Sequence, residues 1–274
     1  MRTHSQNGTV ELYYETFGNP ADPTLLLVNG LGSQCINFKE AFCEKFAANG
    51  FQVVRFDNRD VGLSSHLPDG PEYTLADMAD DGFAVLDAVG AQQAHIAGWS
   101  MGGMIVQTMA LAHPQRVLSM TTVMSSPGGV ALAADPDVAA VFGAKAPKTR
   151  DEAVAQYIAG INVWGSPAFR EVERLTADAE AAYDRCFDPK GRARQVAAIA
   201  RSGSRQEALR SLAVPTLVLH GDADRLVPID AGRLTHECIP GSTFSVVEGM
   251  GHDYPPQLWD TIVERITTHA RGVS

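Results

Sequence analysis

Residues 98–102, with the sequence GWSMG, place one serine between two glycines where an apolar run gives way to a helical pattern. Glycine is favoured where the backbone turns sharply or approaches another segment closely. A serine at such a strand-to-helix turn is typical of a nucleophile whose hydroxyl projects into a cleft. A phosphate-binding loop is the alternative, but it would need a following lysine or a dinucleotide-binding spacing, and neither is present. We therefore predict that Ser100 is a nucleophile.

A serine hydroxyl reacts only when a neighbouring base takes its proton and a third group holds that base. His252 is the best-placed base, because it follows the last predicted strand in a loop rich in glycine and proline. The acid should follow the preceding strand, in the segment HGDADRLVP. We predict Asp224, which is far enough along this segment to turn back toward the cleft. Asp222 is expected to cap its own loop and is the alternative acid.

The remaining histidines have less suitable positions. His220 ends a predicted strand and is expected to bond to the neighbouring turn. His95, at a strand start, and His113, before a proline, have no partner that the sequence indicates. Four others are predicted to be ordinary surface residues: His4, His66, His236 and His269.

The elements that must position these residues alternate along the chain between short apolar runs and helical patterns. This alternation predicts an α/β fold, with a mostly parallel twisted sheet and helices on both faces. The segment 9–18 and the run after it are expected to add antiparallel edge strands. Strands are predicted at 24–30, 51–57, 95–100, 117–125, 215–221 and 243–249, and helices at 35–50, 73–90 and 256–270.

Residues 127–211 break this alternation, because they are Ala-rich and helical without a convincing strand. We predict a helical cap over the site, inserted between a first part of the core (1–126) and a second part (212–274). The alternative is that these helices only pack against the core and do not form a cap over the site. Tyr157, Ile161 and Trp164 share one helix face, which favours core packing, although Tyr157 and Trp164 are the candidate substrate contacts.

Composition limits the partners and the compartment. A formal charge of −10 argues against nucleic acid and against an anionic membrane surface, since both would repel the chain. No apolar run reaches the roughly 18 residues that cross a bilayer, and no signal-peptide segment is present, so we predict a cytoplasmic protein. Four scattered cysteines are typical of reduced thiols. No metal site or cofactor is predicted, and monomer and dimer both stay open.

Three segments in this order, GWSMGG, HGDADRLVP and GMGH, resemble the nucleophile, acid and histidine segments of the α/β-hydrolase superfamily. FDNRDVGLSS is similar to the D-x-R-x-x-G-x-S loop of cofactor-free esterases and perhydrolases. Together with the Asn-Gly pair in VNGLGS, it also resembles the branch that contains aclacinomycin methylesterase. The resemblance covers the whole predicted core. It implies the α/β-hydrolase fold and a Ser-His-Asp triad.

Within this fold, two backbone amides hold the negative charge that develops on the substrate oxygen. Met101, directly after the serine, is the predicted first donor, since a helix N-terminus also favours negative charge. Leu31 in the segment VNGLGS is the predicted second donor, and Gly30 is expected to allow the substrate to approach closely. A plain surface turn is the alternative for this segment.

The predicted function is a carboxylic-ester hydrolase that forms an acyl-enzyme on Ser100 and acts on small to medium apolar esters. Its predicted partner is therefore a small-molecule ester. A serine at the turn argues against haloalkane dehalogenases and epoxide hydrolases, which use aspartate there. A lactonase, a thioesterase or a cofactor-free perhydrolase could use the same triad. A C–C bond hydrolase and a non-catalytic ligand-binding protein are less favoured alternatives.

Overall fold

The computed structural model describes residues 1–5, 8–68, 70, 72–129 and 135–273. In these residues the strands form one sheet in the order β1-β2-β4-β3-β5-β6-β7-β8. From β4 to β8 every neighbouring pair is parallel. All six predicted strands are present. The strands are β1 (Arg2–His4), β2 (Glu11–Phe17), β3 (Thr24–Val28), β4 (Gln52–Phe56), β5 (Ala94–Trp99), β6 (Val117–Val123), β7 (Thr216–Gly221) and β8 (Thr243–Val247).

The antiparallel edge differs in detail from the prediction. Strand β2 pairs antiparallel with β1 on one side and with β4 on the other. The run after β2 is β3, and it lies inside the parallel part of the sheet. The prediction of β3 as an edge strand was therefore wrong, and the short segment before β2 takes that place. The five residues of β3 are all buried, as expected for a strand covered on both faces.

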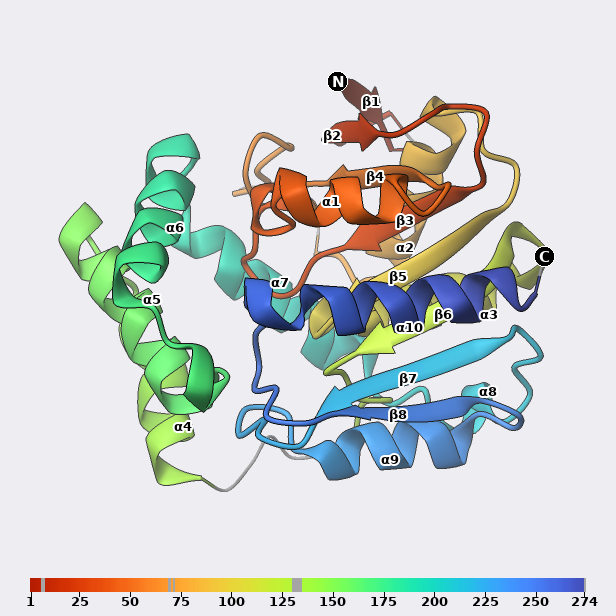
Figure 1. The fold of residues 1–274 in the computed structure, drawn as a ribbon. Coiled ribbons are helices and arrows are strands. Elements are labelled where there is room, and N and C mark those ends of the chain that lie inside the picture. The colour runs from red at the N-terminus through yellow and green to blue at the C-terminus, as the bar shows by residue number, and fades with distance from the viewer. Residues whose placement is uncertain (6–7, 69, 71, 130–134, 274) are drawn as a thin grey trace.

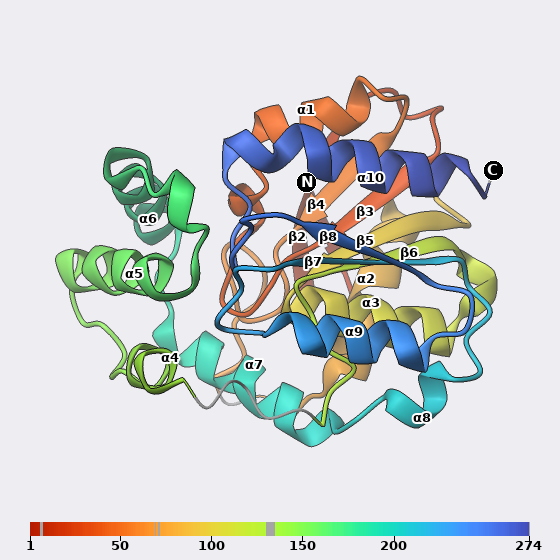
Figure 2. The same ribbon diagram turned by 60° about the horizontal axis from the view of Figure 1, so that its bottom comes forward.

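Helices cover both faces of the sheet (Figure 2). Helices α1 (Glu40–Ala47) and α10 (Trp259–Arg271) lie on one face, where Phe42 and Phe46 join the apolar core. Helices α2 (Leu75–Ala88), α3 (Met101–Ala112) and α9 (Ile229–Cys238) lie on the other. Helix α2 begins with a capping box of Thr74 and Asp77.

Helix α1 is shorter than the predicted helix over 35–50, because the first residues of that predicted stretch bond to the side chains of Arg55 in β4 and of Asp57 just after it. The Cys35 amide donates to Asp57 Oδ1 at 2.6 Å, and Arg55 donates to the Phe38 carbonyl. These contacts hold Cys35–Asn37 in a short 3-10 turn, and the α-helix begins at Glu40.

Between β6 and β7 the described residues form helices and no strand. Helices α4, α5 and α6 lie beyond the carboxyl ends of the parallel strands (Figure 1), whereas α7 packs on α2 and α8 packs on α3 and α9. Residues 130–134, at the start of the predicted cap, lie outside the described residues. The helices are α4 (Pro136–Phe142), α5 (Arg150–Trp164), α6 (Val172–Arg185), α7 (Pro189–Ser202) and α8 (Gln206–Leu209).

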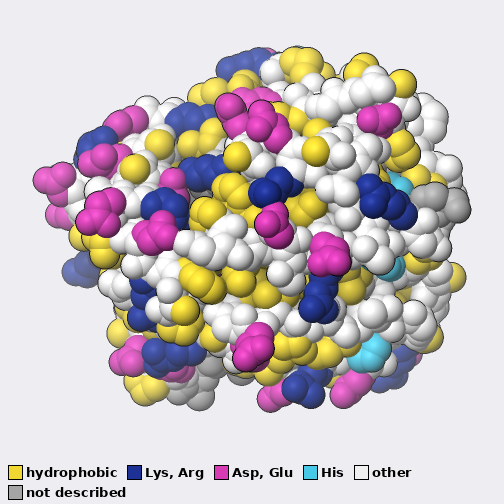
Figure 3. Space-filling model, in the orientation of Figure 1, with side chains coloured by type: hydrophobic (Ala, Val, Ile, Leu, Met, Phe, Trp, Pro, Cys, Tyr) yellow, Lys and Arg dark blue, Asp and Glu magenta, His cyan; other side chains and the backbone are white. Residues whose placement is uncertain are grey.

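Acidic and basic side chains are interspersed over the face shown in Figure 3. Several form ion pairs between elements: Arg150 of α5 contacts Glu180 and Asp184 of α6 at 2.6 and 2.8 Å. Exposed pairs of this kind contribute little each, so apolar packing must hold these helices together. In the described residues no helix is both long enough and apolar enough to cross a bilayer.

Candidate active site

Ser100 lies at the junction of β5 and α3 in a backbone conformation that non-glycine residues rarely adopt, with φ 56° and ψ −118°. Its neighbours explain why glycine is needed on both sides. A Cβ atom on Gly98 would lie 2.1 Å from the Gly102 carbonyl oxygen, and one on Gly102 would lie 2.0 Å from the Val28 oxygen. The two glycines therefore let β3, β5 and α3 meet closely enough to form this turn.

A continuous hydrogen-bonded chain joins the three residues predicted from the sequence. His252 Nε2 lies 2.9 Å from Ser100 Oγ, and His252 Nδ1 lies 2.7 Å from Asp224 Oδ2. Since a carboxylate can only accept a hydrogen bond, Nδ1 carries a proton and donates to Asp224, and the unprotonated Nε2 faces the serine hydroxyl. This arrangement is the one in which His252 can take the serine proton.

Asp224 is held firmly in place. Its Oδ1 accepts from the Leu226 and Val227 amides, each at 2.9 Å, and its side chain is fully buried. His220 donates from Nε2 to the Val227 carbonyl at 2.8 Å, as predicted, and burial lowers its pKa and favours the neutral ring. Asp222 points elsewhere: its Oδ1 accepts from the Gly249 amide rather than capping its own loop as predicted.

The helical segment between β6 and β7, which we call the insertion, holds the loop that carries His252. The His252 amide donates to the Trp164 carbonyl at 2.6 Å, and the Gly251 amide donates to Ser166 Oγ at 2.9 Å. The Ser166 amide in turn donates to Asp253 at 2.8 Å. The end of α5 therefore fixes the position of the histidine.

The predicted oxyanion donors flank the serine. A Cβ atom on Gly30 would lie 3.2 Å from Ser100 Cβ and 3.8 Å from Oγ, so the loop that carries Leu31 passes directly beside the hydroxyl. Met101 is the first residue of α3. In the described part of the chain neither the Leu31 amide nor the Met101 amide donates a hydrogen bond. Both amides remain available for an oxygen atom of a ligand.

Gln195 of α7 holds this loop from the side of the insertion. Its Oε1 accepts from the Gly32 amide at 2.8 Å, and its Nε2 donates to the Arg59 carbonyl at 2.8 Å. The residue is completely buried. Asn29 also braces the loop, since its Nδ2 donates to the Gln34 carbonyl at 2.9 Å. A buried amide with both ends bonded fixes the backbone next to Leu31.

We expect Gln195→Met to lower kcat about tenfold to a hundredfold with little change in KM, because a misplaced Leu31 amide stabilises the transition state less. Steady-state kinetics on a short p-nitrophenyl ester measure both constants, and thermal unfolding reports stability. Gln93→Met, at an exposed glutamine that bonds to Gln115, is the matched control. A lower melting temperature with unchanged kcat and KM would show that Gln195 only supports the fold.

A cavity of about 870 Å³ opens above Ser100. Gly30, Tyr157 and Trp164, the predicted substrate contacts, all line it. Trp99 also lies at the wall, but it is only 1% exposed and packs edge-on against Phe38. Most of the wall is apolar, including Leu31, Met124, Val141, Ile161, Ala179 and Leu226.

A model of the α/β-hydrolase fold family matches residues 23–159, half of the chain. The chain belongs to the α/β-hydrolase fold family. Rhodomycin D methylesterase DauP of Streptomyces sp. (strain C5) is 28% identical and covers 97% of this chain and 96% of its own. A putative carbamate hydrolase, RutD of Caulobacter segnis, is 30% identical over 97% and 98% of the two chains. The esterase RhEst1 of Rhodococcus sp. ECU1013 superposes with a TM-score of 0.81 at 26% identity, covering 100% and 99%.

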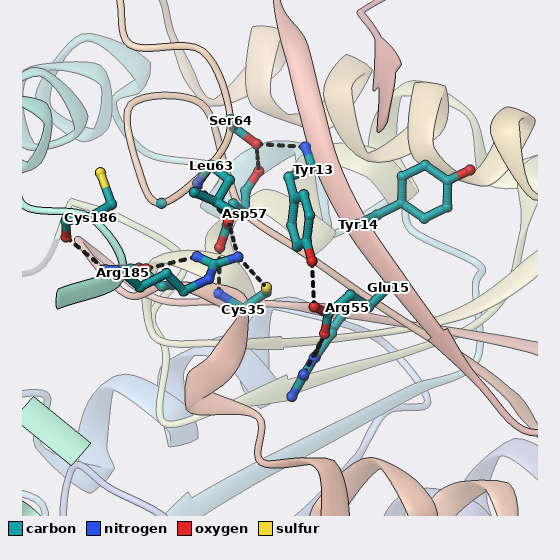
Figure 4. A network of polar contacts seen from close by, with 12 residues as sticks. Tyr13, Tyr14, Glu15, Cys35, Arg55, Asp57, Leu63, Ser64, Arg185 and Cys186 are labelled. Carbon is teal, nitrogen blue, oxygen red and sulfur yellow. Dashed lines mark hydrogen bonds and ion pairs between the residues drawn. The ribbon is translucent and has the colours of Figure 1, made fainter. Parts of the chain in front are cut away.

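A polar network joins the insertion of this α/β-hydrolase to its core, and sequence reasoning missed it (Figure 4). Arg185 at the end of α6 pairs with the buried Asp57 at 2.8 Å and donates to Gln34 at 2.7 Å. Asp57 also accepts from the Leu63 amide, and its own carbonyl accepts from Ser64. Asp57, Leu63 and Ser64 belong to the segment FDNRDVGLSS, so this segment anchors the insertion to the core.

His66 was wrongly predicted to be an ordinary surface residue. It lines the cavity, and its Nδ1 lies 2.8 Å from Asp188. Asp60, His66 and Asp188 form a group whose potential ligand atoms lie within 4.8 Å of one another. Arg194 bonds to both carboxylates, at 2.7 and 2.9 Å, and thus already supplies the positive charge that a metal ion would bring. No local pattern indicates this group, because Asp188 lies 122 residues after His66 in the chain.

Proposed function

We propose that the protein is a carboxylic-ester hydrolase that uses Ser100, His252 and Asp224 as a catalytic triad. One observation carries this proposal: the hydrogen-bonded chain from Asp224 through His252 to Ser100 Oγ ends in a cavity of about 870 Å³. The names of the methylesterase and esterase relatives point to the same chemistry. The net charge of −10 supports a small molecule, rather than nucleic acid, as the partner.

In the acylation step Ser100 Oγ forms a bond to the ester carbonyl carbon while His252 Nε2 takes the serine proton. The Leu31 and Met101 amides stabilise the negative oxygen that results. The bond to the leaving alcohol then breaks, and His252 returns its proton to that alcohol. The products of this step are a free alcohol and an acyl group on Ser100.

Water then completes the reaction. It attacks the acyl carbon while His252 takes one of its protons, and the bond to Ser100 Oγ breaks as that proton returns to the serine. The net change is one ester and one water converted into a carboxylic acid and an alcohol. Asp224 stays ionised throughout and stabilises the protonated His252.

A substrate panel tests the proposal: p-nitrophenyl esters from C2 to C12, methyl esters, lactones and thioesters, each with and without peroxide. We expect hydrolysis of esters with an apolar body, because most of the cavity wall is apolar. Faster turnover of lactones or thioesters, or a peroxide-dependent product, would move the assignment to those members of the class. Absence of turnover on the whole panel would contradict it.

We infer that the insertion acts as a cap that sets the size of the substrate. Helix α5 places Trp164 and Tyr157 in the cavity wall, and the Trp164 backbone holds His252 through its carbonyl. A side-chain change at Trp164 leaves this backbone bond in place and enlarges the pocket.

Trp164→Ala is therefore expected to move the chain-length optimum toward longer esters. For each two methylenes of added acyl length that the enlarged pocket accepts, we expect kcat/KM relative to the shorter ester to change about tenfold. The measurement is kcat/KM across the C2 to C12 series. Val172→Ala, at an exposed position on α6, is the control. The same relative values in the Trp164 variant and the wild type would show that Trp164 is only part of the core.

A further inference from the structure

Three lysine and arginine side chains line the cavity in the described residues, and two of them have acidic partners. Lys39 pairs with Asp178 at 2.8 Å, and Arg174 contacts the same carboxylate at 3.3 Å. The third is Arg192 of α7, for which the described residues supply no hydrogen bond and no ion pair. Arg192 is therefore the basic group of this cavity whose charge is not balanced by a neighbour.

Arg192 lies close to the reacting end of the cavity. A Cβ atom on Gly32 would meet its Cβ, Cγ and Cδ atoms at 3.4 to 3.5 Å, so its stem packs over the loop that carries Leu31. Its guanidinium carbon lies 4.6 Å from the centre of the Phe142 ring, and Phe142 also lines the cavity. The aromatic face orients the guanidinium but supplies only part of the stabilisation that an ion would.

The acidic groups of the cavity are already engaged. Asp60 and Asp188 both bind Arg194, at 2.7 and 2.9 Å. Asp178 binds Lys39, and Asp253 accepts from the Ser166 amide at 2.8 Å.

Arg192 is therefore available to bind an incoming anion, because no described carboxylate pairs with it. Arg192 is an exposed residue, but the protein atoms around its guanidinium lower its pKa, and no carboxylate acts against this effect. A guanidinium at the cavity wall without a counter-ion can bind an anion without first giving up an existing ion pair. A guanidinium binds a carboxylate through two parallel hydrogen bonds, which gives both strength and orientation.

We propose that Arg192 binds an ionised carboxylate of the substrate, so that the preferred substrate is an ester with an apolar body and a second, free carboxylate. This proposal rests on the proposed ester hydrolysis and narrows its substrate class. The product would be a dicarboxylic acid when the carboxylate lies on the acyl side. The purely apolar ester predicted from the sequence would leave Arg192 without a partner.

Monomethyl and dimethyl esters of straight-chain dicarboxylic acids, from malonate to suberate, test the proposal. At one chain length the wild type should hydrolyse the monoester with a kcat/KM at or above that of the diester. Arg192→Met should lower kcat/KM for that monoester about tenfold to a hundredfold and leave the diester within about threefold. Arg192→Lys keeps the charge without the paired donors and should fall between them.

Arg233→Met, at an exposed arginine of α9 outside the cavity, should change neither value. The diester rate and the melting temperature show that each variant is folded, and Arg192→Lys decides the matter when Arg192→Met does not fold. Equal ratios of monoester to diester turnover in wild type and Arg192 variants would overturn the proposal. Wild-type turnover of diesters without turnover of any monoester would do the same. No turnover of any ester would instead overturn the proposed hydrolase function.

Discussion

His252→Ala is expected to lower kcat by about five to six orders of magnitude, because no other described group lies within hydrogen-bond distance of Ser100 Oγ to take its proton. Turnover of a p-nitrophenyl ester measures the loss, and a highly purified preparation is needed to detect the residual rate. Substrate binding should change much less, since His252 forms only a small part of the cavity wall.

His4→Ala is the matched control, at an exposed histidine of the edge strand β1, and it should retain wild-type kcat. Circular dichroism of both variants shows whether the fold is retained. A folded His252→Ala protein with kcat within about tenfold of wild type would mean that another group is the base.

Asp224→Asn is expected to lower kcat about a thousandfold to ten-thousandfold. The amide can still accept from the Leu226 and Val227 amides, so the loop should keep its shape. It cannot supply the negative charge that stabilises the protonated His252, and it favours the wrong ring tautomer. The measurement is kcat on the ester used for the histidine variant.

Asp222→Asn is the closest control, two residues earlier in the same loop. Asp222 bonds to the Gly249 amide and makes no contact with His252 in the described structure, so we expect kcat within a few-fold of wild type. A larger loss for Asp222→Asn than for Asp224→Asn would show that the acid is assigned to the wrong residue.

Local patterns predicted much of the fold. Short, mostly apolar runs marked the parallel strands, and β3 and β5 are buried along their whole length, as expected for strands covered on both faces. The motif around Ser100 could be recognised because its glycines answer a local steric need: side chains at 98 and 102 would collide with backbone atoms. His252 and Asp224 could be chosen by their places after the last two strands, because the carboxyl ends of parallel strands share one edge of the sheet.

Contacts between distant segments could not be predicted in this way. Gln195 and Gly32 are 163 residues apart, and nothing in either local sequence indicates the other. The same holds for Arg185 and Asp57, and for His66 and Asp188. An unpaired arginine such as Arg192 is harder still to predict, because its role depends on which neighbours the fold gives to every other charge.

The reaction of the native protein with a fluorophosphonate probe tests the central claim most directly, because the probe modifies only a serine activated by a neighbouring base. Peptide mass spectrometry locates the adduct. We predict a single adduct on Ser100 in the wild type, no adduct in Ser100→Ala, and strongly slowed labelling in His252→Ala. A folded wild-type protein that is not modified at Ser100 would contradict the account.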